Sequence, residues 1–184
     1  MSNNTKIFVV DFEDSFTFNI ASEIYQNEKR VEVISHGEFF RSYADDLISK
    51  GKSHKFGVVL GPGPGHPEAY STYFEKISIL KNSSQIFLMG ICLGHQIISL
   101  VDGLKVRQSS KPMHGAQVKI DFNNTNLLVQ RYNSLSVYSS NSDDEELMVR
   151  RWNRGISYQF HPESIGTHHN HIFFSDMFEF LSSI

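Results

Sequence analysis

Hydrophobic and polar residues repeat with two different periods along the first half of the chain. Short apolar runs predict β-strands at residues 6–10, 31–34, 56–60 and 85–91. Apolar residues at helical spacing predict α-helices at residues 15–27, 44–50, 70–81 and 93–101. Asp14 or Ser15 can cap the first of these helices.

The predicted strands and helices alternate, which indicates an α/β fold. Such alternation is typical of a mostly parallel central sheet with helices on both faces. In sheets of this kind, ligands bind at the carboxyl ends of the strands. We therefore expect the chemistry of this chain just after its predicted strands.

The second half of the chain has a different pattern, in which short strand-like segments follow one another. They lie at residues 104–107, 116–121, 127–132, 136–139, 147–151 and 156–160, and a closing helix is predicted at residues 171–181. The acidic segment at residues 141–146 is expected to be a surface turn. No repeat, linker or domain boundary is evident, so we expect residues 1–184 to form one domain.

Composition and charge narrow the class of protein. Of the 184 residues, 40% are hydrophobic and 15 are Phe, which is typical of a folded globular protein. The formal net charge of −3 argues against a general nucleic-acid binder, which needs a basic surface. No apolar run reaches the ~20 residues that cross a bilayer, and the polar N-terminus is unlike a signal peptide. We therefore expect a cytoplasmic protein with no nucleic-acid or membrane partner.

Cys92 is the only cysteine of the sequence, so an internal disulfide is excluded. A lone cysteine is often a small buried hydrophobic residue. Here it lies within residues 90–94 (GICLG), between a predicted strand and a predicted helix, as in a nucleophile elbow. The helix N-terminus favours a thiolate, and the Leu93 amide can help to stabilise an oxyanion. Cys92 is thus either a packed turn residue or a nucleophile.

A histidine and a glutamate follow the last predicted strand as His161-Pro162-Glu163. Pro162 disfavours helix at His161, and residues i and i+2 of an extended segment point to the same side. His161 could then take the proton of a thiol and later protonate a leaving group, while Glu163 orients the imidazole. A surface His beside a surface Glu is the alternative. Because Cys92 and His161 both follow strands of one predicted sheet, the fold allows them to meet.

Alternating glycine and proline residues at 61–65 (GPGPG) follow the third predicted strand. This run is unfit for helix or strand and predicts a rigid loop with exposed backbone N–H groups. At the same sheet edge as Cys92, the loop could supply a second oxyanion donor. A phosphate site is disfavoured because no Lys-Ser/Thr pair follows. A stiff connector is the other interpretation.

Together these segments resemble the class I (triad) glutamine amidotransferases, and most closely the small glutaminase subunit of anthranilate synthase and aminodeoxychorismate synthase. The resemblance runs nearly from end to end and implies the flavodoxin-like fold of that family, with no cofactor. The matching segments are DFEDSFTFN at 11–19, LGPGPG at 60–65, GICLGHQ at 90–96, KPMHG at 111–115, YNSL at 132–135 and QFHPES at 159–164. Several matching segments in the right order are stronger evidence than any one of them.

The resemblance implies a role for individual residues. Cys92 would be the nucleophile that forms a glutamyl thioester, His161 the general base and acid, and Glu163 the residue that orients His161. The backbone of Gly63 and Leu93 would form the oxyanion hole. The predicted contacts to the glutamine substrate are Gly63, Pro64, Gly65, Gln96, Ser134 and Leu135. Considered alone, Gln96 is a polar helix residue and Ser134 a turn residue.

Two features depart from the family pattern. Asn133 stands where the family has His, which we expect to weaken a hydrogen bond near the glutamine site. The stretches at 115–132 and 137–159 look shorter than usual, so an altered partner interface is expected.

The histidine-rich end of the chain raises the question of a metal. The spacing His168-His169-x-His171 is suggestive, but a second ligand cluster is missing from the sequence pattern. The resembling family needs no metal for amide hydrolysis, and we expect none.

The function that the resemblance implies is hydrolysis of L-glutamine and delivery of ammonia to a chorismate-using synthase, in anthranilate (tryptophan) or aminodeoxychorismate (folate) synthesis. Three alternatives stay open: a triad glutaminase of another amination pathway, a cysteine hydrolase or protease, and a non-catalytic binding subunit. The DSFT segment disfavours the first, Gln96 and the glycine-proline loop disfavour the second, and the complete Cys-His-Glu set disfavours the third.

Overall fold

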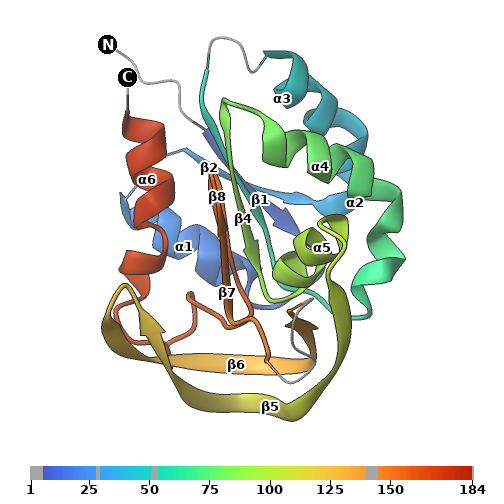
Figure 1. The fold of residues 1–184 in the computed structure, drawn as a ribbon. Helices are drawn as coiled ribbons and strands as arrows, with labels where there is room; N and C mark the ends of the chain where they lie inside the picture. The colour runs from blue at the N-terminus through green and yellow to red at the C-terminus, as the bar shows by residue number, and fades with distance from the viewer. Residues whose placement is uncertain (1–5, 28–29, 51–53, 140–144, 184) are drawn as a thin grey trace.

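A computed structural model describes residues 6–27, 30–50, 54–139 and 145–183. Strands and helices alternate through its first half, as the hydrophobic pattern predicts (Figure 1). The strands are β1 (Lys6–Asp11), β2 (Val31–Ser35), β3 (Phe56–Leu60), β4 (Ile86–Ile91), β5 (Lys105–Phe122), β6 (Thr125–Tyr138), β7 (Val149–Trp152) and β8 (Gly155–Tyr158). The α-helices are α1 (Thr17–Asn27), α2 (His36–Glu38), α3 (Ala44–Lys50), α4 (Phe74–Asn82), α5 (Leu93–Val101) and α6 (Ser175–Ser182).

A six-stranded sheet forms the centre of the molecule, in the order β2-β1-β3-β4-β8-β7. Every neighbouring pair is parallel except β7 and β8, which form an antiparallel hairpin at one edge. Helices α1 and α6 lie on one face, and α3, α4 and α5 lie on the other (Figure 1). The predicted mostly parallel α/β fold is confirmed. Because β4 and β8 are parallel neighbours, the segments that follow their carboxyl ends lie close together.

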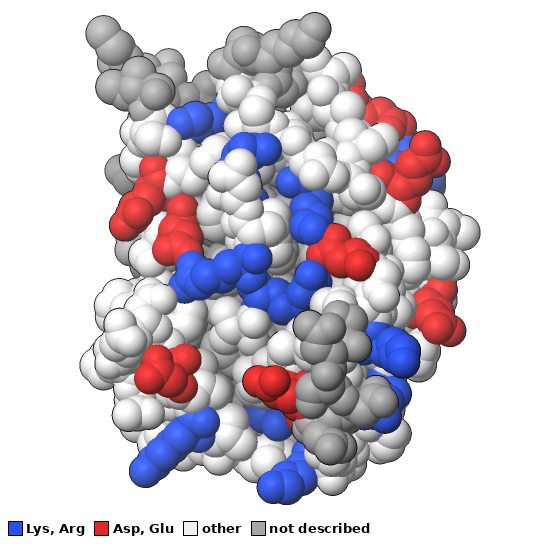
Figure 2. Space-filling view, in the orientation of Figure 1, with Lys and Arg blue, Asp and Glu red and all other residues white. Residues whose placement is uncertain are grey.

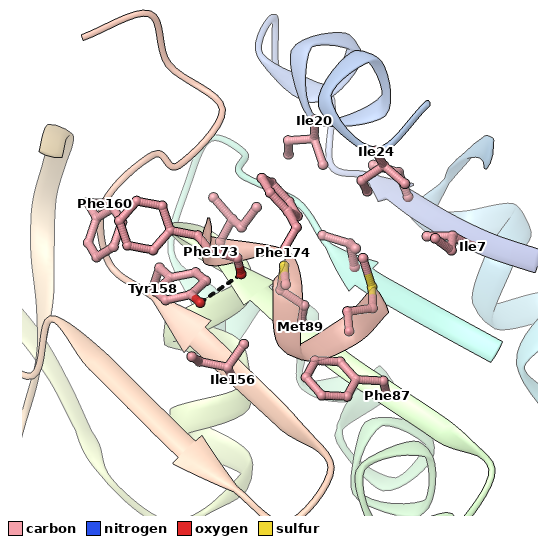
Figure 3. Packing of buried hydrophobic residues seen from close by; sticks show 14 of the residues in the cluster. Ile7, Ile20, Ile24, Phe87, Met89, Ile156, Tyr158, Phe160, Phe173 and Phe174 are labelled. Atoms are coloured by element: carbon pink, nitrogen blue, oxygen red, sulfur yellow. Dashed lines mark hydrogen bonds between the residues drawn. The ribbon is translucent and has the colours of Figure 1, made fainter. Parts of the chain in front are cut away.

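Two hydrophobic cores lie on the two faces of the sheet. In β1 the side chains alternate, so that Val9 enters the core under α1 and α6 while Val10 enters the core under α3, α4 and α5. Figure 3 shows the first core, in which the Tyr158 hydroxyl donates a hydrogen bond of 2.8 Å to the Phe173 carbonyl. This bond satisfies a buried polar group between two aromatic rings. The cores hold β4 and β8 rigidly, and with them the segments that follow.

In the second half of the chain, several strand boundaries differ from the predicted ones. Predicted strands at 104–107 and 116–121 are one strand, β5, and those at 127–132 and 136–139 are one strand, β6. The predicted pieces of β5 are joined by mostly polar residues and by two register shifts between Gln108 and Ala116, which local hydrophobicity does not reveal. Asn123 and Asn124 form the turn between them with φ of 53° and 62°, a conformation that asparagine tolerates well.

Two predicted helices are divided in the structure. The segment predicted at 70–81 is a 3₁₀ helix at Pro67–Tyr73 followed by α4, and the segment at 171–181 is a 3₁₀ helix at Asn170–Phe173 followed by α6. A π-helical segment, Phe39–Tyr43, precedes α3 and was missed. Hydrophobic spacing does not distinguish these tighter or wider turns from an α-helix over so few residues.

The acidic segment at 141–146 is only partly a surface turn. Its residues 141–144 lie outside the described residues, and Glu145 is exposed. Glu146, in contrast, forms an ion pair of 2.7 Å with Arg131 of β6, and both side chains are largely buried. The prediction was therefore wrong for Glu146, because a basic partner distant in sequence draws it inward.

Charged residues are interspersed over the molecular face shown in Figure 2, where lysine and arginine side chains gather near the middle and acidic side chains lie beside them. Ion pairs join Arg150 to Asp102 and Arg151 to Asp176 along the edge strand β7. Charged side chains on an edge strand oppose pairing with a further strand. Among the described helices, none is long and apolar enough to span a membrane.

Candidate active site

Cys92 occupies a sharp turn between β4 and α5, at the N-cap position of the helix. Its φ of 51° and ψ of −100° lie in a region that costs a non-glycine residue about 1–3 kcal/mol. Backbone hydrogen bonds hold the turn on both sides: the Cys92 N–H donates to the Tyr158 carbonyl (2.8 Å), and the Gln96 N–H donates to the Cys92 carbonyl (3.1 Å). The structure therefore contains the strained turn that the GICLG segment predicts.

Glycines allow neighbouring elements to approach this turn closely. A Cβ atom at Gly94 would overlap the backbone carbonyl of Leu60 at the end of β3. A Cβ atom at Gly90 would lie 2.8 Å from the carbonyl of Gly94. Side chains at either position would push α5 away from the sheet and move Cys92 with it.

His161 and Glu163 form a buried pair after β8. The His161 Nδ1 and Glu163 Oε1 atoms are 2.7 Å apart, and the residues are 2% and 4% exposed. The backbone N–H of His161 also donates to the backbone carbonyl of Gln130 in β6 (2.9 Å), which anchors the segment that follows β8. Residues 162–163 form a turn rather than the extended segment that we expected. The two side chains nevertheless meet, so the alternative of an exposed surface pair is excluded.

The chemistry of His161 is set by its two polar neighbours. Burial lowers its pKa, but hydrogen bonding and charge interactions with Cys92 and Glu163 outweigh burial and raise the pKa well above its usual value. Its Nε2 atom is buried and makes no hydrogen bond of normal geometry with the described residues. The contact between the His161 ring and Cys92 is therefore a loose one, without normal hydrogen-bond geometry. Hydrogen bonds between catalytic groups are often of this kind in enzymes without bound substrate. With Nδ1 held by Glu163, Nε2 is the atom that can exchange a proton with the thiol.

The glycine-proline loop lies beside the elbow. The Gly94 N–H donates to the Gly61 carbonyl (3.1 Å), which joins the loop to α5. A Cβ atom at Gly63 would lie 2.5 Å from the Phe12 Cβ and 2.7 Å from the Leu93 Cδ2, so only glycine permits this packing. Gly63 and the Leu93 side chain are thus neighbours, and an oxyanion hole formed by their backbone N–H groups stays a prediction. Pro64 and Gly65, predicted to contact substrate, are exposed further along the same loop.

Gln96 and Leu135 meet beside Cys92. The Gln96 Nε2 donates to the Leu135 carbonyl (2.8 Å) and to the Gln159 Oε1 (3.3 Å). Gln159 in turn has its Nε2 atom 3.9 Å from the Cys92 sulfur. Gln159 was not among the predicted site residues, although it is a fully buried amide in an otherwise apolar run. An amide at the end of an apolar strand was the sequence signal for it.

Ser134 and Asn133 point to different surroundings. The Ser134 hydroxyl lies 3.4 Å from the His114 Nε2, on the partly exposed side of β6. Asn133 is buried instead, where its Nδ2 donates to the Leu135 carbonyl and its Oδ1 accepts from the Arg131 Nε, each at 3.0 Å. Asn133 therefore supports the backbone of the predicted glutamine site from behind.

No group of three or more His, Cys, Asp or Glu side chains is placed to hold a metal ion within the ranges that the structure describes. A cavity of about 460 Å³ lies at the other end of β4 and β8, where Phe87, Arg151 and Trp152 contribute to its lining. Parallel sheets bind ligands at their carboxyl edge. The candidate site is therefore the elbow region and not this cavity.

Comparison with known proteins agrees with this geometry. The sequence model described as glutamine amidotransferase class-I matches residues 8–180. The chain is 30% identical over 181 residues to the pyocyanine-specific anthranilate synthase component 2 of Pseudomonas aeruginosa, covering 89% of this chain and 88% of that protein. It is 32% identical over 187 residues to an aminodeoxychorismate synthase of Streptomyces griseus, covering 90% of this chain and 25% of that protein.

Solved structures show the same fold. A Thermoplasma acidophilum protein assigned to GMP synthase has a TM-score of 0.74 and 17% identity, with 97% of this chain and 94% of that chain covered. A glutamine amidotransferase of Thermotoga maritima has a TM-score of 0.62 and 16% identity, covering 86% of this chain and 76% of that chain. At such identities the likeness supports the fold alone. The family match over residues 8–180 decides the family: this chain belongs to the class I glutamine amidotransferases.

Proposed function

We propose that this chain is a glutaminase subunit, which hydrolyses L-glutamine through a thioester on Cys92 and delivers ammonia to a chorismate-using synthase. The observation that carries the proposal is the buried His161–Glu163 pair beside a cysteine on a strained elbow. The names of the relatives, anthranilate synthase component 2 and aminodeoxychorismate synthase, support the identity of the partner. The acceptor reaction would be formation of anthranilate or of 4-amino-4-deoxychorismate.

In the first half of the reaction, His161 takes the thiol proton and the Cys92 sulfur attacks the side-chain carbonyl carbon of glutamine. The carbonyl oxygen becomes an oxyanion, which the backbone N–H groups of Leu93 and Gly63 stabilise. The tetrahedral intermediate collapses as the carbon–nitrogen bond breaks. His161 returns the proton to the leaving amine, so ammonia departs and a glutamyl thioester remains.

In the second half, water attacks the thioester carbonyl while His161 removes a proton from it. The intermediate expels the Cys92 sulfur, which is reprotonated, and glutamate leaves. Glu163 would orient the ring and stabilise the imidazolium that forms twice per turnover. Buried position and a short contact to Nδ1 suit Glu163 to this role.

The glutamine substrate would be held by the surrounding polar groups. The Gln96 side chain and the backbone at Ser134 and Leu135 would contact its α-amino and α-carboxylate groups. The loop at 63–65 would close over the reacting amide. In support, Gln96 already bonds the Leu135 carbonyl within reach of Gln159 and Cys92.

The experiment compares glutamine-dependent and ammonia-dependent synthesis in the complex with the co-purified partner. Cys92→Ala and Cys92→Ser are expected to abolish glutamine-dependent product formation and to spare ammonia-dependent formation, since the partner's own site is untouched. Unchanged glutamine use by Cys92→Ala would refute the catalytic role and favour a non-catalytic subunit. The product identified by mass spectrometry separates the anthranilate from the aminodeoxychorismate role.

A second measurement tests dependence on the partner. We expect low glutaminase activity from the isolated chain and a marked rise when the synthase is added. Full activity of the isolated chain would contradict partner activation. Ammonia delivered to an acceptor other than chorismate would reassign the chain to another amination pathway.

A further inference from the structure

Three aromatic rings from distant segments, one of them that of the candidate general base, lie in mutual contact. The Phe16 ring centroid lies 5.4 Å from that of His161 and 5.2 Å from that of Tyr132. The Tyr132 ring meets the His161 ring edge-on at 5.3 Å, with an interplanar angle of 84°. These separations are those of direct aromatic contact. His161 is therefore enclosed by Phe16 from the start of α1 and by Tyr132 from β6.

The segment that carries Phe16 is held by its own carboxylates. The Asp11 Oδ1 accepts hydrogen bonds from the Glu13 N–H (2.9 Å) and from the buried Thr17 hydroxyl (2.7 Å). The Asp14 Oδ1 accepts from the Phe16 N–H at 2.8 Å. Glu13 has a φ of 67°, which brings the chain back sharply before α1. The acidic and hydroxyl residues of the DFEDSFT segment thus fix the position of the Phe16 ring.

The second ring is positioned by the hairpin. Gly115 has a φ of 78° beside a register shift between His114 and Ala116, and a Cβ atom there would lie 3.4 Å from the Tyr132 ring. The Tyr132 carbonyl oxygen lies 4.0 Å from the Cys92 sulfur. Tyr132 therefore contacts both partners of the proposed proton transfer, through its ring on one side and its backbone on the other.

A histidine ring turns about its Cβ–Cγ bond, and a single hydrogen bond at Nδ1 limits this motion without stopping it. Glu163 holds the Nδ1 atom of His161 by a hydrogen bond, whereas Nε2 has only the loose contact with Cys92. Flanking rings restrict this rotation by shape, and they displace water from the charged pair.

We propose that Phe16 is a positioning residue, and that the rings of Phe16 and Tyr132 form an aromatic clamp that holds His161 facing Cys92 and excludes water from the His161–Glu163 pair. The clamp deepens the proposed function, since it rests on the catalytic role of His161. It also gives a purpose to the DFEDSFT segment, which the proposed chemistry does not otherwise use.

The test uses the full chain labelled with ¹⁵N-histidine, in which NMR observes the Nδ1–H proton of His161. The signal is assigned by its absence in His161→Asn. Phe18 supplies a matched control, because it lies two residues from Phe16 and is 68% exposed. We expect a protected signal in the unsubstituted protein and in Phe18→Ala, and its loss through exchange with water in Phe16→Ala.

Kinetics supply the second readout. Because the clamp orients a reacting group and does not bind glutamine, Phe16→Ala is expected to lower the glutaminase kcat about 10- to 100-fold while KM changes by less than about twofold. Phe16→Leu refills most of the apolar volume but lacks a ring, so it should lower kcat only about threefold and weaken the Nδ1–H signal without abolishing it. If Phe16→Ala does not fold, Phe16→Leu carries the test, with a kcat lowered about threefold and a weakened signal.

Several outcomes would overturn the clamp. They are a fully protected signal in Phe16→Ala, equal loss of signal in Phe18→Ala, absence of the signal in the unsubstituted protein, or an unchanged kcat in folded Phe16 variants. The NMR readout needs neither glutamine nor partner. Absence of glutaminase activity in every protein, including the unsubstituted one with the synthase partner added, with the signal behaving as expected, would therefore refute the proposed function and leave the ring geometry supported.

Discussion

Two regions of the molecule each bury one histidine. The carboxyl edge of the sheet buries His161, and the interface between α5 and β8 buries His95. The pKa values of the two histidines are shifted in opposite directions. At the edge, His161 is paired with Glu163 and contacts Cys92, and its pKa is raised despite burial. Behind the elbow, His95 has its Nδ1 2.8 Å from the Ser157 hydroxyl. Burial, with a smaller contribution from Arg150, lowers the pKa of His95 to about 3. Comparable burial is thus accompanied by a raised pKa in one region and a lowered pKa in the other.

The difference lies in the charge of the neighbours. His161 faces a carboxylate, which stabilises an imidazolium, whereas His95 faces a hydroxyl and a nearby guanidinium. His95 lies within the first turn of α5, close to Cys92 in sequence, yet its ring is turned toward β8. Proximity to a nucleophile along the chain therefore does not make a histidine catalytic. Substitutions at the two histidines and at their neighbours should separate the two environments.

Exchange of His161 is expected to have the largest effect. His161→Asn should lower glutamine-dependent synthesis about 10³-fold or more, because general acid–base catalysis at both steps is lost. His95→Asn should lower it less than about tenfold at pH 8, since His95 makes no contact with the reacting groups. Steady-state rates of the complex measure both. Comparable losses in the two variants would remove the contrast.

Removal of the charge on Glu163 should have the next largest effect. Glu163→Gln keeps the shape of the side chain but cannot stabilise an imidazolium, so kcat should fall about 10²-fold. The pKa of His161 should also move downward, because a charge interaction that raises it is lost. NMR titration of labelled histidine checks this shift. An unchanged His161 titration would show that Glu163 is not the controlling neighbour.

Acid should destabilise the fold through His95. The pKa of His95 is about 3 in the folded protein and near 6.5 in the unfolded chain, so the unfolded chain binds more protons between these values. The contribution of His95 to the free energy of unfolding is therefore highest above pH 6.5 and decreases as pH falls toward 3, by about 2–3 kcal/mol at pH 4.5. The contribution of His161 to the free energy of unfolding has the opposite sign. It is present below pH 6.5 and is lost as pH rises through the raised pKa of His161.

Urea unfolding across pH 4.5–8 measures this prediction. His95→Asn should be less stable at pH 8 but should lose less stability on acidification than the unsubstituted protein. Identical acid slopes in the two proteins would assign the acid sensitivity to other groups.

Loss of the Ser157 hydroxyl should have the smallest effect. Ser157→Ala removes the hydroxyl that contacts the Nδ1 atom of His95, whose Nε2 atom has no hydrogen-bond partner among the described residues. The free energy of unfolding should therefore fall by about 1–2 kcal/mol. Thermal unfolding at pH 8 checks the change. If Ser157→Ala were neutral, the hydrogen bond would not be the feature that keeps His95 in place.

Most elements in the first half of the fold, and the main residues of the candidate site, were predicted from the sequence. The strand at Ile86–Ile91 and the helix at Leu93–Val101 were predicted within one residue, because continuous apolar runs and flanking glycines leave few alternatives. Cys92, His161 and Glu163 were identified from short segments, and the structure brings them together. The long hairpin was predicted only in pieces, since mostly polar stretches such as residues 108–112 interrupt its apolar pairs.

Residues that act on the site through space were not identified from the sequence. By local pattern, Phe16 is a helix-start residue, Tyr132 a strand residue and Gln159 the end of an apolar run. Only packing places the Phe16 and Tyr132 rings on His161 and the Gln159 amide near the Cys92 sulfur. Similarly, Glu146 is drawn inward by Arg131, a residue of another strand. Local patterns contain no information on such contacts.

By itself, the sequence determined the alternation of strands and helices, the elbow at Cys92 and the family, because each of these depends on residues close together in the chain. The tertiary structure alone decided which histidine gains a carboxylate and which becomes neutral, and which rings enclose the former. The physical reason is that a pKa and a side-chain orientation depend on neighbours in space, whose positions are fixed only when both faces of the sheet are packed.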